Sequence, residues 1–140
     1  MGKLTNFLFV IITFTLLSCN IEDGGELCGK SAVIDNSLFT STNTNNYTIT
    51  KAEIKDNCLI VKISSGGCSG NSWKLTLIDS SNIAESLPEQ RFLKLALENT
   101  EVCLAIVTKE FSFDISNLQT TNSQIILNLE KWNQQINYEY

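Results

Sequence analysis

The stretch Cys-Leu-Ile-Val-Lys-Ile-Ser-Ser-Gly-Gly, residues 58–67, decides the fold of this chain. Leu59, Val61 and Ile63 occupy alternate positions, so an extended backbone places their side chains on one face. The two glycines that close the stretch are a turn signal. The stretch therefore predicts a β-strand with one buried face that ends in a tight turn.

The same period of two recurs downstream, and short polar segments typical of turns separate the runs. The further alternating apolar sets are Trp73-Leu75-Leu77, Leu93-Leu95-Leu97, Phe111-Phe113-Ile115, Ile125-Leu127-Leu129 and, as a last edge strand, Ile136-Tyr138-Tyr140. Residues 102–107 are apolar on both faces, which predicts a central strand covered on both sides. About seven or eight short strands without a long helical pattern predict an all-β fold, a small antiparallel β-sandwich of immunoglobulin-like or barrel-like form.

Three segments depart from this alternation. The run from Ile49 to Ile54 breaks its period near Lys51 and Ala52, which predicts a β-bulge. Residues 82–87 are expected to form one helical turn. Residues 40–46, Thr-Ser-Thr-Asn-Thr-Asn-Asn, predict an exposed loop because such residues favour turns over buried strands.

The N-terminus has the residue order of a secretory leader. Lys3 supplies a positive charge, an apolar run extends from Phe7 to Phe14, and Leu16-Leu17-Ser18 precedes Cys19. An apolar run of roughly ten residues is too short to span a hydrocarbon core about 30 Å thick. The order resembles the signal sequence of a bacterial lipoprotein, which implies cleavage between Ser18 and Cys19 and acylation of the Cys19 thiol. An ordinary signal peptide and a retained transmembrane anchor are the alternatives.

This leader divides the chain into three regions: a signal peptide over residues 1–18, a lipidated N-terminus and tether over residues 19–29, and a β-sandwich domain over residues 30–140. Residues 20–29 are expected to be a tether because they have few apolar positions to bury. A lipoprotein of this kind is expected in the cell envelope, anchored by its lipid to the outer membrane. The sequence leaves open whether it faces the periplasm or the cell surface.

The amino-acid composition argues against several classes of function. The chain has 10 basic and 15 acidic residues, and because only Lys3 leaves with the leader, the mature charge is 9 minus 15, or −6. An acidic chain without a basic cluster argues against nucleic acid as a partner. There is no histidine, which removes the commonest general base and metal ligand. We therefore expect no enzyme, no cofactor and no bound metal. Asp79, Glu85 and Glu89 are expected to be solvated loop charges.

The cysteines indicate covalent cross-links. Besides Cys19 the chain has four: Cys28, Cys58, Cys68 and Cys103. An even number in an exported domain predicts two disulfides, although four cysteines allow three pairings. A zinc site is disfavoured because no two of them have the Cys-x₂₋₄-Cys spacing of a zinc knuckle. Buried free thiols are the remaining alternative.

Four segments carry a resemblance to a known group of proteins: Gly66–Leu75, Glu85–Pro88, Glu101–Ala105 and Phe113–Leu118. Over about residues 57–118 the chain resembles a family of uncharacterised exported bacterial lipoproteins with Gly-Gly-Cys-x-x-His, Glu-Ser-x-Pro, Asp-x-Cys-x-Ala and Phe-Asp-Leu-x-x-Leu segments. The resemblance implies that Cys68 pairs with Cys103, which leaves Cys28 to pair with Cys58. Asn71 stands where that family has its first histidine, and a residue near Glu98 replaces a second.

The aromatic residues suggest where a partner could bind. Trp73, Phe92, Phe111 and Phe113 fall on strand positions and are expected in the core. Trp132, Tyr138 and Tyr140 cluster near the C-terminus among polar residues and are expected to form an exposed patch. The sequence thus favours a lipid-anchored, non-catalytic binding or accessory module whose partner, besides the membrane, is an envelope protein or a glycan. A metal-binding or enzymatic envelope protein and a purely structural lipoprotein are the alternatives.

Overall fold

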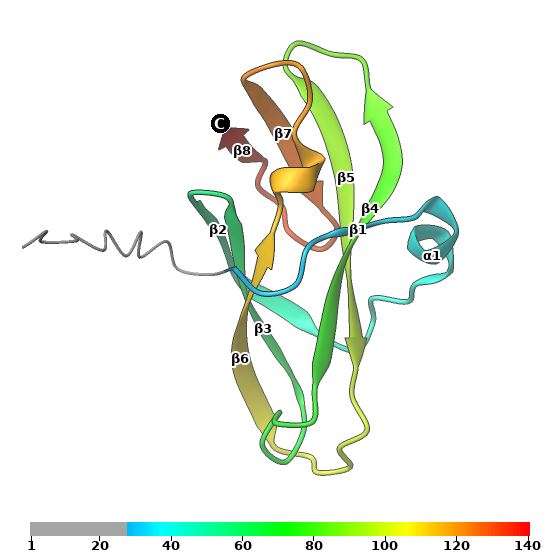
Figure 1. Cartoon of the computed structure of the whole chain (residues 1–140). Helices are drawn as coiled ribbons and strands as arrows, with labels where there is room; N and C mark the ends of the chain where they lie inside the picture. The colour runs from blue at the N-terminus through cyan, green and yellow to red at the C-terminus, as the bar shows by residue number, and fades with distance from the viewer. Residues whose placement is uncertain (1–27) are drawn as a thin grey trace, which may run out of the picture.

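The computed structural model describes residues 28–140 as two β-sheets packed face to face (Figure 1). One sheet has the strand order β2–β3–β6 and the other the order β1–β4–β5–β7–β8. The strands are β1 Val33–Ile34, β2 Thr48–Lys55, β3 Cys58–Gly66, β4 Lys74–Ala84, β5 Glu89–Glu98, β6 Ile106–Asp114, β7 Gln124–Leu129 and β8 Ile136–Glu139. The expected all-β sandwich is confirmed. Over residues 28–140 the sheets do not close into a barrel, and two pairs, β1 with β4 and β5 with β7, are parallel rather than antiparallel.

The core lies between the two sheets and consists of the alternating residues predicted above. Leu59, Val61 and Ile63 of β3 are fully buried. Facing them from the other sheet are the buried residues Leu75, Leu77, Leu93, Leu95, Leu97, Ile125, Leu127 and Leu129. Each such side chain contributes about 1.5–3 kcal/mol by leaving water, so this interface dominates the stability of the fold. The expected bulge is also present, as a shift of the β2–β3 register between Ile49 and Lys51.

The prediction of a central strand at residues 102–107 is wrong. Residues 101–105 form a loop, and β6 begins only at Ile106. Val102, Leu104 and Ile106 are exposed rather than covered. The reason is topological, because the chain leaves β5 in one sheet and enters β6 in the other, and the intervening residues must cross between the layers.

The helical turn predicted at residues 82–87 is also wrong. Residues 82–87 form no helix, because β4 continues to Ala84 before the chain turns. Within residues 28–140 the α-helix is instead α1, Asn36–Ser41, which begins where the Asp35 side chain accepts a hydrogen bond from the Leu38 backbone N–H. It packs on β4 and shields that strand's outer face. A short 3₁₀ helix, η1, spans Ser116–Leu118.

Both disulfides are formed, Cys28 with Cys58 and Cys68 with Cys103. These are the pairs that the resemblance implied. The first bond holds the beginning of the described chain against the start of β3. The two disulfides place the domain in an oxidising compartment outside the cytoplasm. The leader, Cys19 and the tether up to residue 27 lie outside the described residues, and no helix over residues 28–140 is long and apolar enough to cross a membrane.

Candidate functional site

A groove of about 330 Å³ lies on the outer face of the five-stranded sheet. Phe92 of β5 and Asn128 of β7 contribute to it from the sheet, Phe39 comes from α1, and Trp132 comes from the turn after β7. Three aromatic side chains from three separate elements therefore surround one concave surface. The groove is the candidate functional site.

The pleat of β5 explains why Phe92 belongs to the groove and not to the core. Its neighbour Leu93 points into the sandwich, so Phe92 points outward and is 40% exposed. The expectation that Phe92 is a core residue is therefore wrong, whereas Trp73 and Phe113 are buried and Phe111 is partly buried against the core. Phe92 could have been found from sequence by its alternation with the core leucines.

The turn after β7 positions Trp132. Lys131 adopts a positive φ of 66°, which reverses the chain direction directly after the strand. The Trp132 backbone N–H then donates to the Leu129 carbonyl at 3.0 Å, and the Glu130 N–H donates to the Leu93 carbonyl at 2.9 Å. These bonds hold the turn against β5 beside Phe92.

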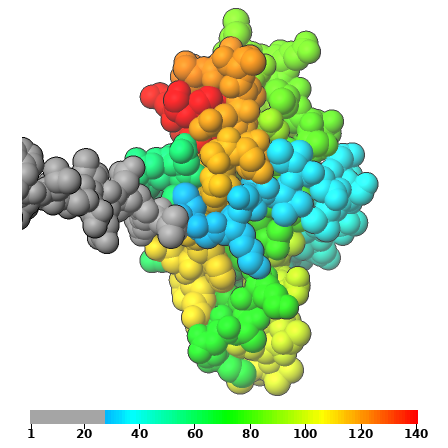
Figure 2. Space-filling model, viewed as in Figure 1, coloured from blue at the N-terminus to red at the C-terminus, as the bar shows by residue number. Residues whose placement is uncertain are grey.

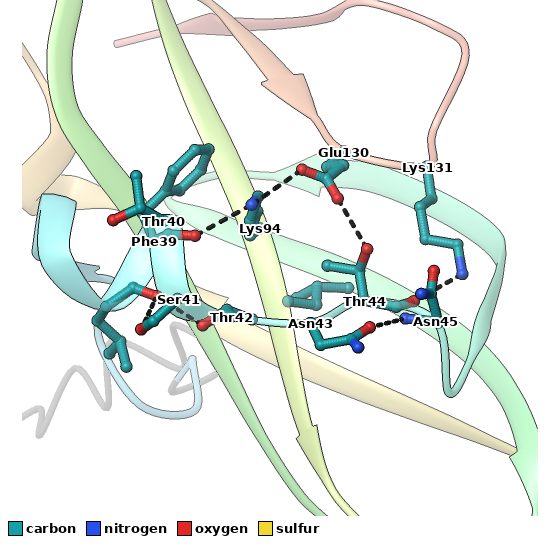
Figure 3. A network of polar contacts seen from close by, with 12 residues as sticks. Phe39, Thr40, Ser41, Thr42, Asn43, Thr44, Asn45, Lys94, Glu130 and Lys131 are labelled. Atoms are coloured by element: carbon teal, nitrogen blue, oxygen red, sulfur yellow. Dashed lines mark hydrogen bonds and ion pairs between the residues drawn. The ribbon is translucent and has the colours of Figure 1, made fainter.

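A polar network fixes the wall of the groove that α1 provides (Figure 3). The Lys94 ammonium donates to the Phe39 carbonyl at 3.0 Å, lies 4.5 Å from the Phe39 ring centroid and pairs with Glu130 at 3.3 Å. Glu130 also accepts a hydrogen bond from the Thr44 hydroxyl at 2.7 Å. Thr44 is consequently buried, and the segment expected as an exposed loop is in part tied to the sheet.

The remaining lining of the groove is rich in side-chain amides. Asn133, Gln134 and Gln135 line one part of it, and within residues 28–140 their side chains make no hydrogen bond. Each amide offers both donors and an acceptor to a ligand. Asn128 donates to the Gln90 side-chain oxygen at 3.0 Å, which fixes its orientation. The groove thus combines ordered aromatic walls with amides that have no partner in the described chain.

The aromatic patch expected at the C-terminus does not form. Tyr138 is fully buried, because the alternation of β8 turns it inward, and its hydroxyl donates to Asn57 at 2.6 Å. Burial raises the pKa of Tyr138. Tyr140 packs against the Tyr138 ring with centroids 4.8 Å apart and does not line the groove. Of the three predicted residues, only Trp132 belongs to the candidate site.

The carboxylates give no metal site in the part of the chain that the structure describes. Asp79, expected to be solvated, is fully buried and pairs with Arg91 at 3.0 Å. It also accepts a hydrogen bond from the Ser81 N–H at 2.8 Å. Desolvation raises the pKa of Asp79 despite these partners. The pair is therefore part of the fold and cannot serve as a surface ligand site.

The glycine-rich turn after β3 binds a carboxylate of the protein itself. The Ser69 and Gly70 N–H groups donate to Glu101 at 2.9 and 3.0 Å, and the Cys68 N–H donates to the same oxygen. These bonds lower the pKa of Glu101 to about 2. The side-chain oxygen of Asn71, at the position where the resembling family has histidine, accepts a bond from Lys109 at 2.9 Å. The turn therefore acts as a structural clamp, with its amides already occupied.

No protein-family model and no curated protein matches the chain. Two solved structures share its fold. One is a protein of unknown function, DUF1344, from Bacteroides vulgatus ATCC 8482, with 17% identity and a TM-score of 0.52 over 81% of this chain and 57% of that chain. The other, from Parabacteroides distasonis ATCC 8503, is provisionally described as toxin-related, with 16% identity and a TM-score of 0.54 over 81% of this chain and 60% of that chain. The chain thus spans less than two thirds of the length of either protein, and at this identity the likeness shows the fold alone.

Proposed function

We propose that the protein is a lipid-anchored, non-catalytic glycan-binding module of the cell envelope. The observation that carries this proposal is the groove, in which Phe39, Phe92 and Trp132 surround one surface beside side-chain amides without partners. The leader that precedes Cys19 supports a lipid anchor in the outer membrane, and the two disulfides support a location outside the cytoplasm.

The chemistry of the lining favours a neutral sugar over a charged ligand. A pyranose ring presents apolar C–H faces that pack on aromatic rings, and its hydroxyl groups both donate to and accept from amides. The cation and the anion nearest the aromatic walls, Lys94 and Glu130, neutralise each other at 3.3 Å. Ligand pockets span roughly 300–1,000 Å³, so a groove of about 330 Å³ suits a short segment of a glycan chain.

Replacing Trp132 with alanine is expected to weaken glycan binding at least tenfold, because it removes one aromatic wall and the area that a sugar ring would cover. The measurement is binding of the wild type and the variant to an array of neutral bacterial oligosaccharides, followed by calorimetric titration of the best ligand. Tyr140→Ala is the matched control, since Tyr140 is an exposed aromatic residue outside the groove. No binding by the wild type, or equal loss in both variants, would contradict the proposal.

The anchor requires its own test. Cys19→Ser is expected either to release the domain into the soluble fraction or to leave the precursor uncleaved, because serine offers no thiol for acylation. The measurement is membrane fractionation in the native host with radiolabelled palmitate. Asn20→Ser, which keeps the acceptor cysteine, serves as control and should remain labelled and membrane-bound. Normal processing and membrane retention of Cys19→Ser would show that the anchor assignment is wrong.

A further inference from the structure

Three apolar side chains project from one end of the molecule. Val102, Leu104 and Ile106 are 90%, 98% and 76% exposed. They lie at alternate positions where the loop after β5 enters β6. The loop after β3 lies at the same end, as Figures 1 and 2 show in yellow and green. We call residues 102–106 the apolar tip.

The apolar tip is held in place. Cys103, between the exposed Val102 and Leu104, is bonded to Cys68 of the other loop. The Gly67 N–H donates to the Ala105 carbonyl at 2.9 Å, and the Asn99 side chain donates to the Gly66 carbonyl at 2.7 Å. Both ends of the tip are therefore tied to β3 and its turn. The exposed side chains are displayed by a fixed backbone and would lose little conformational freedom on binding.

The apolar tip is also uncharged. Neither residues 102–107 nor residues 66–73 contain an acidic or basic residue. The adjoining Glu101 directs its carboxylate to the amides of the neighbouring turn. A chain with a net charge of −5 thus presents two end loops without a free carboxylate, and the cation that reaches the β3–β4 turn, Lys109, donates to the Asn71 side chain at 2.9 Å. Such a surface suits the apolar boundary of a bilayer, where transfer of a charge would be costly.

The tether is long enough for Cys19 to reach the level of the apolar tip. The nine residues from Cys19 to Cys28 can span at most about 30 Å. Cys28 is bonded to Cys58 at the start of β3, and the strand runs from Cys58 to Gly66 at the tip end, eight residues or about 26 Å further on. A chain attached at Cys28 can therefore reach the level of the tip, so acyl chains on Cys19 and the tip can enter the same surface.

From these observations we propose that the apolar tip inserts into the leaflet that carries the acyl chains of Cys19, as a second membrane contact. The inference rests on the lipid anchor of the proposed function. Insertion at residues 102–106 would stand the domain on the tip and direct the opposite end, the β4–β5 turn at Leu87, away from the bilayer (Figure 1).

The test uses the mature, acylated protein that begins at Cys19, in vesicles of phosphatidylethanolamine and phosphatidylglycerol with dibrominated acyl chains, which quench tryptophan in contact with them. The variant Leu104→Trp places a reporter on the tip. Leu87→Trp is the matched control, because Leu87 is 97% exposed at the opposite end. Subtracting the wild-type signal removes Trp73 and Trp132. We expect the added emission at position 104 to fall at least twofold and shift to shorter wavelength, and that at position 87 to stay unchanged.

Flotation of the same samples separates the tip from the anchor. If the protein floats with the vesicles while position 104 is not quenched, or is quenched no more than position 87, the tip proposal is overturned and the anchor stands. If the protein does not float, the anchor fails and the tip proposal fails with it. A blue shift that appears only on addition of envelope proteins, without quenching by brominated lipid, would assign the tip to a protein partner and also overturn the proposal.

Discussion

Arg91→Met is expected to lower the free energy of unfolding by about 3–5 kcal/mol at neutral pH, the usual cost of leaving one partner of a buried ion pair alone. Asp79 is 0% exposed, and its carboxylate lies 3.0 Å from the Arg91 guanidinium. Methionine keeps most of the apolar stem of arginine but leaves the carboxylate without a cation. Urea denaturation at pH 7 measures the loss.

The sign of the pH dependence distinguishes this mechanism from a packing defect. Burial raises the pKa of Asp79 above its usual 3.8, and loss of Arg91 should raise it further. A carboxyl group whose pKa is higher in the folded state destabilises that state fully above the folded-state pKa, and the penalty shrinks as the pH falls from there to the unfolded-state pKa of 3.8. We therefore expect the variant to approach the wild type near pH 4.

The double variant Asp79→Asn/Arg91→Met is the control for the buried charge. Asparagine removes the charge but keeps an acceptor for the Ser81 N–H, which lies 2.8 Å from the Asp79 carboxylate. The double variant should therefore recover at least half of the loss at pH 7 and show little of its pH dependence. A double variant as unstable as Arg91→Met alone would attribute the loss to packing.

The sequence predicted the core well because burial in a strand follows the local pleat. The alternate spacing of Leu59, Val61 and Ile63 predicted one buried face. All three are buried because the pleat of β3 turns them to that face. Whether two strands pair in parallel or antiparallel does not depend on the local pleat. The parallel pairing of β5 with β7 depends on which segments meet after long connections, and no alternation pattern encodes that.

Residues 102–107 show where apolar content misleads. An uninterrupted apolar run looks the same whether the segment is a strand covered on both faces or a loop displayed at the end of the fold. Only the crossing from β5 in one sheet to β6 in the other decides between them. Tyr138 is the converse case, since its polar neighbours Asn137 and Glu139 suggested exposure whereas the inward face of β8 buries it.

The groove could be predicted only in part. Trp132 stood out as an aromatic residue among polar neighbours, and the outward position of Phe92 follows from its alternation with Leu93. The sequence did not indicate Phe39, because it lies in a mostly polar segment. In the structure this segment forms α1, which begins at the Asp35 cap. Bringing residues 39, 92 and 132 to one surface requires the packing of α1 on β4 and of the β7–β8 turn against β5, which only the tertiary structure specifies.

The double variant Cys68→Ser/Cys103→Ser is expected to lose about 3–4 kcal/mol of stability on the chain-entropy estimate for a separation of 35 residues. For a domain of this size that corresponds to a fall in the thermal midpoint on the order of 10–20 °C. The matched comparison is Cys28→Ser/Cys58→Ser, whose separation of 30 residues predicts nearly the same entropic loss. An excess loss in the second variant would report packing, because Cys58 is buried whereas Cys68 and Cys103 are exposed.

Without the Cys68–Cys103 bond, Glu101 becomes the main polar tie between the two loops at the tip. Because its pKa is lowered from 4.5 to about 2, it stabilises the fold fully above pH 4.5 and loses this effect as the pH falls toward 2. The thermal midpoint of the Cys68→Ser/Cys103→Ser variant, followed by circular dichroism, should therefore fall further between pH 4.5 and 2.5, and adding Glu101→Gln should weaken that dependence. An unchanged midpoint at neutral pH would show that the hydrogen bonds alone hold the loops and that the disulfide adds nothing to stability.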